Sequence, residues 1–246
     1  MPDLAQLRAR IGALEGLPSL TARTSGAAVP LGLAALDDCL PWGGLPTGGL
    51  HEIRAGRATI PGAALGFSGF CLGRMAAARP GRLVWLTLSD HLHPPGLADL
   101  GVPVDRVLLV RPARSAELLW AAEEVLRCRG VAGLLAETGA IDFKQARRLS
   151  LAARNSGVPG LLLNQGANLG PPLTRWQVSP VPSEATVGVG PWRWRLTLSR
   201  CRGMAASDLD RTLQWDVEVK HAKSGFHLVA LSGDRSPDQA RQRQAG

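Results

Sequence analysis

The chain has 246 residues, 45% of them hydrophobic, which is enough for one sizeable core. No apolar run approaches the ~18 residues of a membrane-spanning helix, so we expect a cytoplasmic protein that makes no membrane contact. The net charge is +8, and with three lysines among the 28 basic residues, 25 are arginine. This charge is compatible with a nucleic-acid or acidic partner, and it is equally explained by a GC-rich genome that favours arginine codons, so direct DNA contact stays open.

The N-terminal residues 1–17 are predicted to form an amphipathic helix. Apolar side chains recur there at spacings of three and four, at Leu4, Leu7, Ile11 and Leu14. Such a stripe is buried either on a neighbouring molecule or on its own domain, and both alternatives stand. Residues 18–30, rich in Pro, Ser, Thr and Gly, are expected to be a linker.

The next stretch has the layout of a phosphate-binding loop. A short helix (Leu31–Leu40) and a strand (Leu50–Ile53) precede a loop and an apolar helix (Ala63–Ala78), and a strand, loop and helix in this order hold an anion with backbone N–H groups. A nucleotide site needs G-x-x-x-x-G-K-[ST], but here the last three positions read PGA, and no lysine precedes Lys144. The loop is therefore degenerate, with its remaining candidate residues at Gly56, Arg57, Thr59 and Gly62.

The middle of the chain alternates strands and helices, as parallel α/β sheets do. The apolar runs of strand length are Arg82–Leu88, Val107–Val110, Val131–Glu137 and Pro159–Asn164, all expected to be buried. Between them we predict two helices, one that Ser115 N-caps and that runs to Arg129, and one over Asp142–Asn155 that Gly157 closes.

Polar residues in this part have ordinary explanations beside functional ones. His91 and His93 follow the first of these strands, and a metal site would need ligands that the sequence does not supply. Four basic residues share about a third of the surface of the 142–155 helix and form either a solvated face or a partner patch: Lys144, Arg147, Arg148 and Arg154.

From Thr174 the pattern changes to alternation, which indicates half-exposed antiparallel strands. Tryptophan and arginine interleave there and are predicted to bind a partner, at Trp192, Arg193, Trp194, Arg195, Arg200, Arg202 and Trp215. They suit an acidic partner segment or stacking on single-stranded bases, or they wall the core at a sheet edge. The polar residues 233–246 are expected to be a disordered tail.

Four segments together resemble the ImuA family, the RecA-like proteins of bacterial mutagenesis cassettes. They are LDDCLPWGGLPTGGLHEI, RLVWLTLSDHLHPPGL, AGLLAETGAIDFKQARRLSLAARNSG and WRLTLSRCRG. The resemblance spans Leu4–Leu231 and implies a RecA-like core over 31–232 with a C-terminal β extension. It also places Asp90 and Glu137 at the carboxylate positions of RecA-like ATPases, where, without the lysine and hydroxyl, we expect relic or helix-capping roles. Asn164-Gln165 resembles the pair that ends the corresponding RecA strand.

The fold expected is therefore α/β, with a mostly parallel sheet flanked by helices, C-terminal antiparallel strands and an N-terminal helix. The chain is not expected to be an enzyme or to hold a cofactor or metal. The resemblance implies an accessory protein of SOS-induced, error-prone translesion DNA synthesis that links RecA to ImuB and, through ImuB, to an error-prone DNA polymerase III alpha-type subunit. The alternatives are an unconventional ATP-dependent, DNA-binding recombinase-like protein and a SulA-like inhibitor of cell division.

Overall fold

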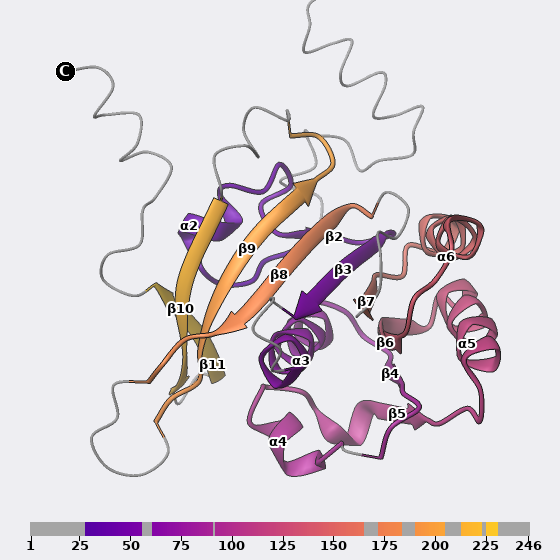
Figure 1. The fold of residues 1–246 in the computed structure, drawn as a ribbon, viewed down its shortest axis with the longest axis horizontal. Coiled ribbons are helices and arrows are strands. Elements are labelled where there is room, and N and C mark those ends of the chain that lie inside the picture. The colour runs from indigo at the N-terminus through magenta and orange to yellow at the C-terminus, as the bar shows by residue number, and fades with distance from the viewer. Residues whose placement is uncertain are drawn as a thin grey trace, which may run out of the picture.

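The computed structural model describes residues 28–55, 61–90, 92–164, 172–183, 190–204, 213–222 and 225–230. They form an α/β fold around one large sheet with helices on both of its faces (Figure 1). The predicted fold class, a mostly parallel sheet flanked by helices with antiparallel strands after it, is confirmed. The predicted N-terminal helix (1–17) and tail (233–246) lie outside the described residues.

The strands of the described ranges are β1 (Ala28–Val29), β2 (Leu45–Pro46), β3 (Leu50–Ala55), β4 (Arg82–Leu86), β5 (Val107–Val110), β6 (Val131–Thr138), β7 (Gly160–Asn164), β8 (Thr174–Pro180), β9 (Arg193–Cys201), β10 (Leu213–Ala222) and β11 (Gly225–Ala230). The helices are α2 (Ala34–Asp37), α3 (Pro61–Ala78), α4 (Pro94–Ala98), the 3-10 helix η2 (Val104–Arg106), α5 (Ser115–Arg127) and α6 (Phe143–Ser156). No helix in this described part of the chain is both long and apolar enough to cross a membrane.

In the described residues the main sheet has nine strands in the order β11-β10-β9-β8-β3-β7-β6-β4-β5. Five neighbouring pairs, from β8 to β5, are parallel, and the three pairs from β8 to β11 are antiparallel. The antiparallel region was predicted to begin at Thr174, yet β8 runs parallel to β3 and antiparallel to β9. Alternation of apolar and polar residues indicates which face of a strand is covered, but it does not indicate the direction of the neighbouring strands.

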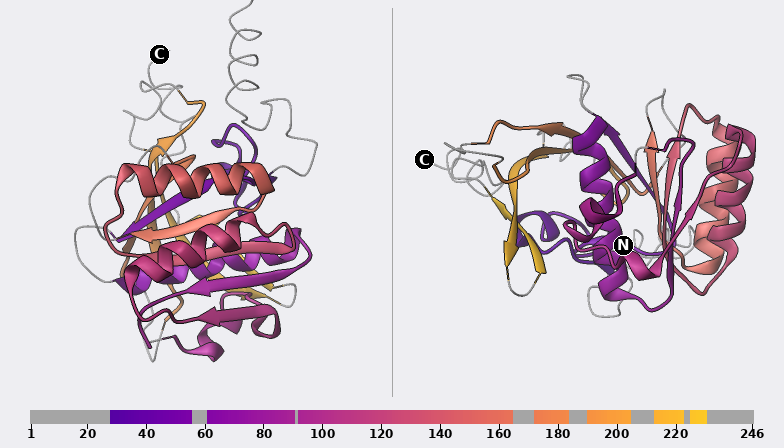
Figure 2. Two further views of the ribbon diagram at one scale, coloured as in Figure 1. Left: turned by 90° about the vertical axis from the view of Figure 1, so that its right-hand side faces the viewer. Right: turned by 90° about the horizontal axis from the view of Figure 1, so that it is seen from below.

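Helix α3 covers one face of the sheet, and α5 and α6 cover the other (Figure 2). Strands β8 to β10 curl around α3, so that this helix is packed against the parallel strands and against the antiparallel ones. Its apolar residues accordingly lie on more than one side, with Phe67 touching both Trp176 and Trp194. Close approach requires small residues here, since a Cβ on Gly66 would lie 2.9 Å from the Trp194 ring.

The two helices on the other face differ in how they begin. Gly157 ends α6 as predicted, at φ 79°, whereas Asp142, predicted as its first residue, is the N-cap. The Asp142 side chain accepts a hydrogen bond from Gln145 N while the Gln145 side chain accepts one from Asp142 N. The prediction that Ser115 caps α5 is wrong, because the cap position is Arg114 and no side chain caps it.

Strand β5 was predicted to be buried, and this prediction is wrong. It is the last strand of the sheet and pairs only with β4 in the described structure, which leaves Leu108 55% and Leu109 36% exposed. Its neighbour β4 also ends earlier than predicted, at Leu86, and Leu88 is 47% exposed. An apolar run of strand length therefore did not distinguish an edge position from a central one.

The N-terminal part of the described chain is tied to the core. Ala28–Val29, at the end of the predicted linker, pairs with β2. The predicted helix over 31–40 is reduced to α2, whose Asp37 carboxylate accepts the N–H groups of Leu31 and Gly32, each at 2.8 Å. Burial raises the pKa of Asp37, and these two hydrogen bonds oppose that rise.

Candidate functional site

The predicted phosphate-binding frame lies where β3 leads into α3, at the carboxyl ends of the parallel strands. Gly56, Arg57 and Thr59 lie outside the described residues, and Gly62 is exposed in the first turn of α3. Residues 61–64 read PGAA, so this turn offers a phosphate neither a cationic side chain nor a hydroxyl group. Residues 61–64 therefore stand where a phosphate-binding loop would place its lysine and hydroxyl, and they supply neither.

Glu137, one of the two predicted relic carboxylates, makes a structural contact. It is half-buried near the end of β6, and its Oε1 accepts a hydrogen bond of 2.7 Å from Trp85 Nε1. Trp85 is fully buried on β4, so this carboxylate satisfies an indole N–H inside the core. Asp90 is exposed just after β4, and no group of three or more His, Cys, Asp or Glu in the described residues is placed to bind a metal.

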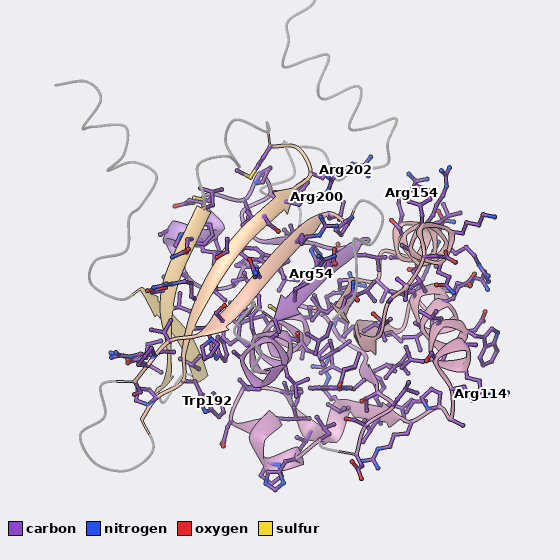
Figure 3. All side chains as sticks on the ribbon, viewed as in Figure 1. Arg54, Arg114, Arg154, Trp192, Arg200 and Arg202 are labelled. Atoms are coloured by element: carbon purple, nitrogen blue, oxygen red, sulfur yellow. The ribbon has the colours of Figure 1, made fainter. Side chains whose placement is uncertain are left out.

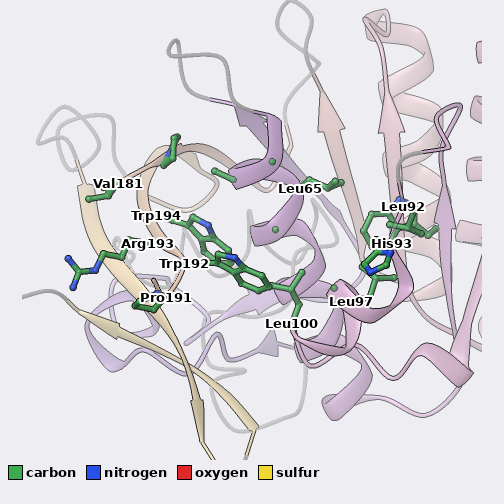
Figure 4. A pocket seen from close by; sticks show the side chains of 16 residues that line it. Leu65, Leu92, His93, Leu97, Leu100, Val181, Pro191, Trp192, Arg193 and Trp194 are labelled. Atoms are coloured by element: carbon green, nitrogen blue, oxygen red, sulfur yellow. The ribbon is translucent and has the colours of Figure 1, made fainter. Parts of the chain in front are cut away.

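A cavity of about 500 Å³ opens beside the first turns of α3 (Figure 4). Most of its wall is apolar and comes from α3, α4 and the neighbouring loop and strand ends, including Leu65, Leu92, Leu97, Leu100 and Trp192. Arg193 also lines it, but its guanidinium points away in Figure 4 and its Nε donates to Glu218 at 2.7 Å. Such walls suit an apolar group better than a triphosphate.

The C-terminal tryptophans and arginines lie on opposite faces of the sheet. Trp194 is 4% exposed and Trp215 1%, and both belong to the core around α3. Assigning these two as partner-binding residues is therefore corrected, since alternation along a strand sends every second side chain inward. Trp192, which precedes β9, is 41% exposed and remains accessible. Base stacking between interleaved tryptophans and arginines does not fit this arrangement.

The arginines lie on the face of β8 to β10 that points away from α3, and this face is called the outer face below. Arg195 makes two hydrogen bonds of 2.6 Å to Asp216, and Arg193 bonds Glu218, whose pKa is held below its usual value mainly by that hydrogen bond. The run 193–202 is poor in acids, but acids on β10 neutralise two of its arginines. Figure 3 shows Arg200 and Arg202 together near the end of β9. 

A buried carboxylate that the sequence analysis missed anchors the same face. Glu52 on β3 is 0% exposed, and it accepts hydrogen bonds from Arg54 at 2.5 Å, Arg175 at 2.6 Å and Asn164 at 3.2 Å. Two arginines on one carboxylate leave the cluster with a net charge of +1. Arg200 adds a further positive charge beside this cluster, because it lies directly opposite Arg175 across β8 and β9. Its buried Nε has no hydrogen-bond partner among the described residues. A glutamate between apolar residues of the predicted strand Leu50–Ile53 was the available signal.

His51, beside Glu52, faces the other side of β3 and is fully buried. Its Nε2 lies 2.9 Å from the Pro46 carbonyl and its Nδ1 2.8 Å from Thr174 Oγ1, which also accepts from Trp176 Nε1. The carbonyl can only accept, so Nε2 carries the proton and Nδ1 accepts from the threonine. Burial lowers the pKa of His51 to about 4, and the chain of bonds is structural.

Some of the remaining candidate site residues are exposed in the described structure, and others lie outside the described residues. On α6, Lys144, Arg147, Arg148 and Arg154 are all exposed, and Arg148 bonds Glu123 of α5, which gives one of the four a structural role. His93 is exposed and lines the cavity, whereas His91 lies outside the described residues. The N-terminal stripe of Leu4, Leu7, Ile11 and Leu14 also lies outside them.

No model of a known protein family matches the chain. The protein ImuA from two strains of Caulobacter vibrioides is 33% identical to it over 241 residues, which covers 91% of this chain and 96% of either relative. The crystal structure of SulA from Pseudomonas aeruginosa is similar with a TM-score of 0.42 and 19% identity, covering 48% of this chain and 98% of SulA. The likeness to SulA is too distant to carry a conclusion. The match to ImuA along nearly its whole length shows that this chain belongs to the ImuA family.

Proposed function

We propose that this chain is a non-catalytic accessory protein of SOS-induced, error-prone translesion DNA synthesis. The observation that carries the proposal is the 33% identity to ImuA over 91% of the chain. In this role it links RecA to ImuB and, through ImuB, to an error-prone DNA polymerase III alpha-type subunit. The protein thus acts by holding partners together, with a core of the ATPase type that turns over no substrate.

Three features support the absence of nucleotide chemistry. The first turn of α3 reads PGAA where a nucleotide site needs lysine and a hydroxyl. The Glu137 carboxylate is engaged by the Trp85 indole at 2.7 Å. The wall of the cavity beside α3 is mostly apolar and includes four leucines and three tryptophans. Each of these favours a scaffold over a phosphate-binding enzyme.

The two partner contacts are assigned to different parts of the chain. We assign RecA to the N-terminal apolar stripe of Leu4, Leu7, Ile11 and Leu14. ImuB is assigned to the outer face, which carries the arginines, and to Trp192, which is exposed directly before β9; tryptophan and arginine are the two residue types that dominate interface energetics. The net charge of the Glu52 cluster and Arg200 suits an acidic segment of that partner.

A nucleotide titration tests the non-catalytic part of the proposal. We expect a fluorescent ATP analogue to show no saturable binding in the micromolar range, and a phosphate-release assay to show no turnover with or without single-stranded DNA. Glu137→Gln and Trp85→Phe are measured beside the wild type. The first replaces the carboxylate with an amide whose oxygen can still accept from Trp85 Nε1, and the second removes the 2.7 Å hydrogen bond and keeps the carboxylate.

Turnover that Glu137→Gln abolishes and Trp85→Phe retains would overturn the proposal. Such turnover would give the Glu137 carboxylate a role in catalysis and would favour the alternative of an unconventional ATP-dependent recombinase-like protein.

A further inference from the structure

The outer surface of α5 and α6 is a layer that no other described element covers. Figure 2 looks onto the two helices, which lie side by side over one face of the sheet. They run in the same direction, because each leads from one parallel strand of the sheet to another. Arg148 of α6 donates to Glu123 of α5 and joins them. Their backbone groups are bonded within each helix, so this surface offers a partner side chains only.

Three large apolar side chains are exposed on this layer. Trp120 on α5 is 65% exposed, and Phe143 and Leu151 on α6 are 56% and 48% exposed. At about 100° per residue, Phe143 and Leu151 lie within about a quarter of the circumference of α6. Trp120 is one turn before Glu123, the residue that reaches α6, so it lies beside the contact between the helices. Apolar residues gathered on one surface mark an interaction site, whereas single ones do not.

The same side of α6 is cationic. Lys144, Arg147 and Arg154 lie within the same span of about 100° as the two apolar residues. The helix has one lysine, three arginines and no acidic residue, a net charge of +4. Lys144 and Arg147 form no ion pair with another described residue. An occupant that excludes water from these cations must therefore bring anionic groups of its own.

The positive charge is confined to α6, which favours a protein over a nucleic acid. Helix α5 has three glutamates and one arginine, a net charge of −2. Trp120, the most exposed aromatic residue of the layer, lies on this helix with Glu117 three positions before it and Glu124 four positions after it. Bases that stacked on Trp120 would therefore find no positive surface for their phosphates. A protein segment can direct its acids toward α6 alone.

A second copy of this chain does not supply those acids from the same layer. Two copies of α6 in contact would bring like charges together. In each copy, all three glutamates of α5 already bond arginines of their own chain. Helix α5 of one copy would therefore give α6 of the other no unpaired carboxylate.

We propose that the outer surface of α5 and α6 binds an amphipathic helix of a partner protein that carries acidic and large apolar residues at spacings of three and four. Its carboxylates pair with Lys144 and Arg147, and its apolar side chains cover Trp120, Phe143 and Leu151. A helix is the element that packs on two neighbouring helices through side chains alone. This surface is separate from the N-terminal stripe, the outer face and Trp192, so the inference does not depend on the function proposed above.

The test selects displayed helical peptides, about 18 residues long and randomised on one face, on the full-length chain; such a helix spans about 27 Å, more than the length of α6. The best peptide is then titrated against Leu151→Asp. Leu88→Asp is the matched control, because Leu88 is 47% exposed and lies beyond the end of β4. We expect acidic, amphipathic peptides that bind Leu151→Asp at least about tenfold more weakly and bind the control as they bind the wild type.

A charge reversal tests the ionic part of the contact. Lys144→Glu combined with Arg147→Glu should weaken the selected peptide, and the same peptide with lysines in place of its acids should bind this double variant and not the wild type. Misfolding of the variant cannot produce that reversal.

A selection that enriches no peptide would overturn the proposal, and so would peptides that lack acids or bind Leu151→Asp as well as the wild type. Binding of a labelled single-stranded oligonucleotide that Leu151→Asp and the double variant both abolish would overturn it in favour of a nucleic acid. Concentration-dependent dimerisation that Leu151→Asp abolishes would overturn it in favour of a second copy.

Discussion

Replacing His51 with glutamine should remove a specific part of the acid sensitivity of this protein. His51 is fully buried, its hydrogen bonds fix it as the neutral form, and burial lowers its pKa from 6.5 to about 4. In the unfolded chain the same residue takes up a proton near pH 6.5, so between pH 6.5 and 4 the unfolded state binds more protons. The stability contribution is therefore complete above pH 6.5 and is lost as the pH falls toward 4.

The size of the effect follows from the two pKa values. The difference between 6.5 and about 4 corresponds to about 3 kcal/mol in total, of which about 2 kcal/mol is lost between pH 7 and pH 5. Urea unfolding followed by tryptophan fluorescence measures the loss in the wild type, in His51→Gln and in His93→Gln, whose histidine is exposed. We expect His51→Gln to lose about 2 kcal/mol less than the other two over this range. Equal losses in all three proteins would refute the assignment of a buried neutral His51.

Three further predictions concern the core, the outer face and the N-terminal stripe. Trp194→Ala should lower the free energy of unfolding by about 3–5 kcal/mol and Trp192→Ala by less than about 1 kcal/mol, because Trp194 is 4% exposed and Trp192 41%. Urea unfolding measures both changes, and similar values for the two variants would contradict the two-face arrangement. Glu52→Gln should cost about 3–5 kcal/mol in the same assay, since it leaves two arginines without their carboxylate, and a change under about 1 kcal/mol would argue against a buried ion pair. Leu7→Asp combined with Ile11→Asp should abolish RecA binding and preserve the thermal transition, whereas loss of the transition would place the stripe in the protein's own core.

Much of the fold was predictable because its signals are local. The capping residues of α6, Asp142 and Gly157, fix that helix through short-range hydrogen bonds and a left-handed turn. Long apolar runs identified β4, β6 and β7. The position of β5 in the sheet was not predictable in this way, because its apolar composition matches that of a central strand and its exposure depends on which strands lie beside it.

Part of the candidate site was also predictable, because its signals lie close together in the sequence. The degenerate loop is evident from the residue types alone. The Glu52 cluster joins β3, β7 and β8. Asn164 and Arg175 lie more than a hundred positions after Glu52, so only the sheet order brings them to it. The roles of Trp194 and Trp215 depended on which side of the sheet α3 covers.

The same packing bears on how the ImuB contact is tested. A fragment ending at Leu173 would lack β8 and β9, whose Trp176 and Trp194 contact Phe67 of α3. We therefore expect that fragment to lose its core together with any binding surface. Substitutions on the outer face, such as Arg200→Glu, separate the two effects, with Lys144→Glu on α6 as a control at a distant basic residue.

Capture of ImuB by immobilised RecA, measured by biolayer interferometry with and without this protein and with no nucleotide present, tests the central claim most directly. We expect ImuB to bind the RecA surface only when the full-length chain is added, and the signal to be lost with Leu7→Asp and Ile11→Asp together. ImuB capture that does not depend on the chain, or that requires ATP hydrolysis, would contradict a non-catalytic link between the two partners.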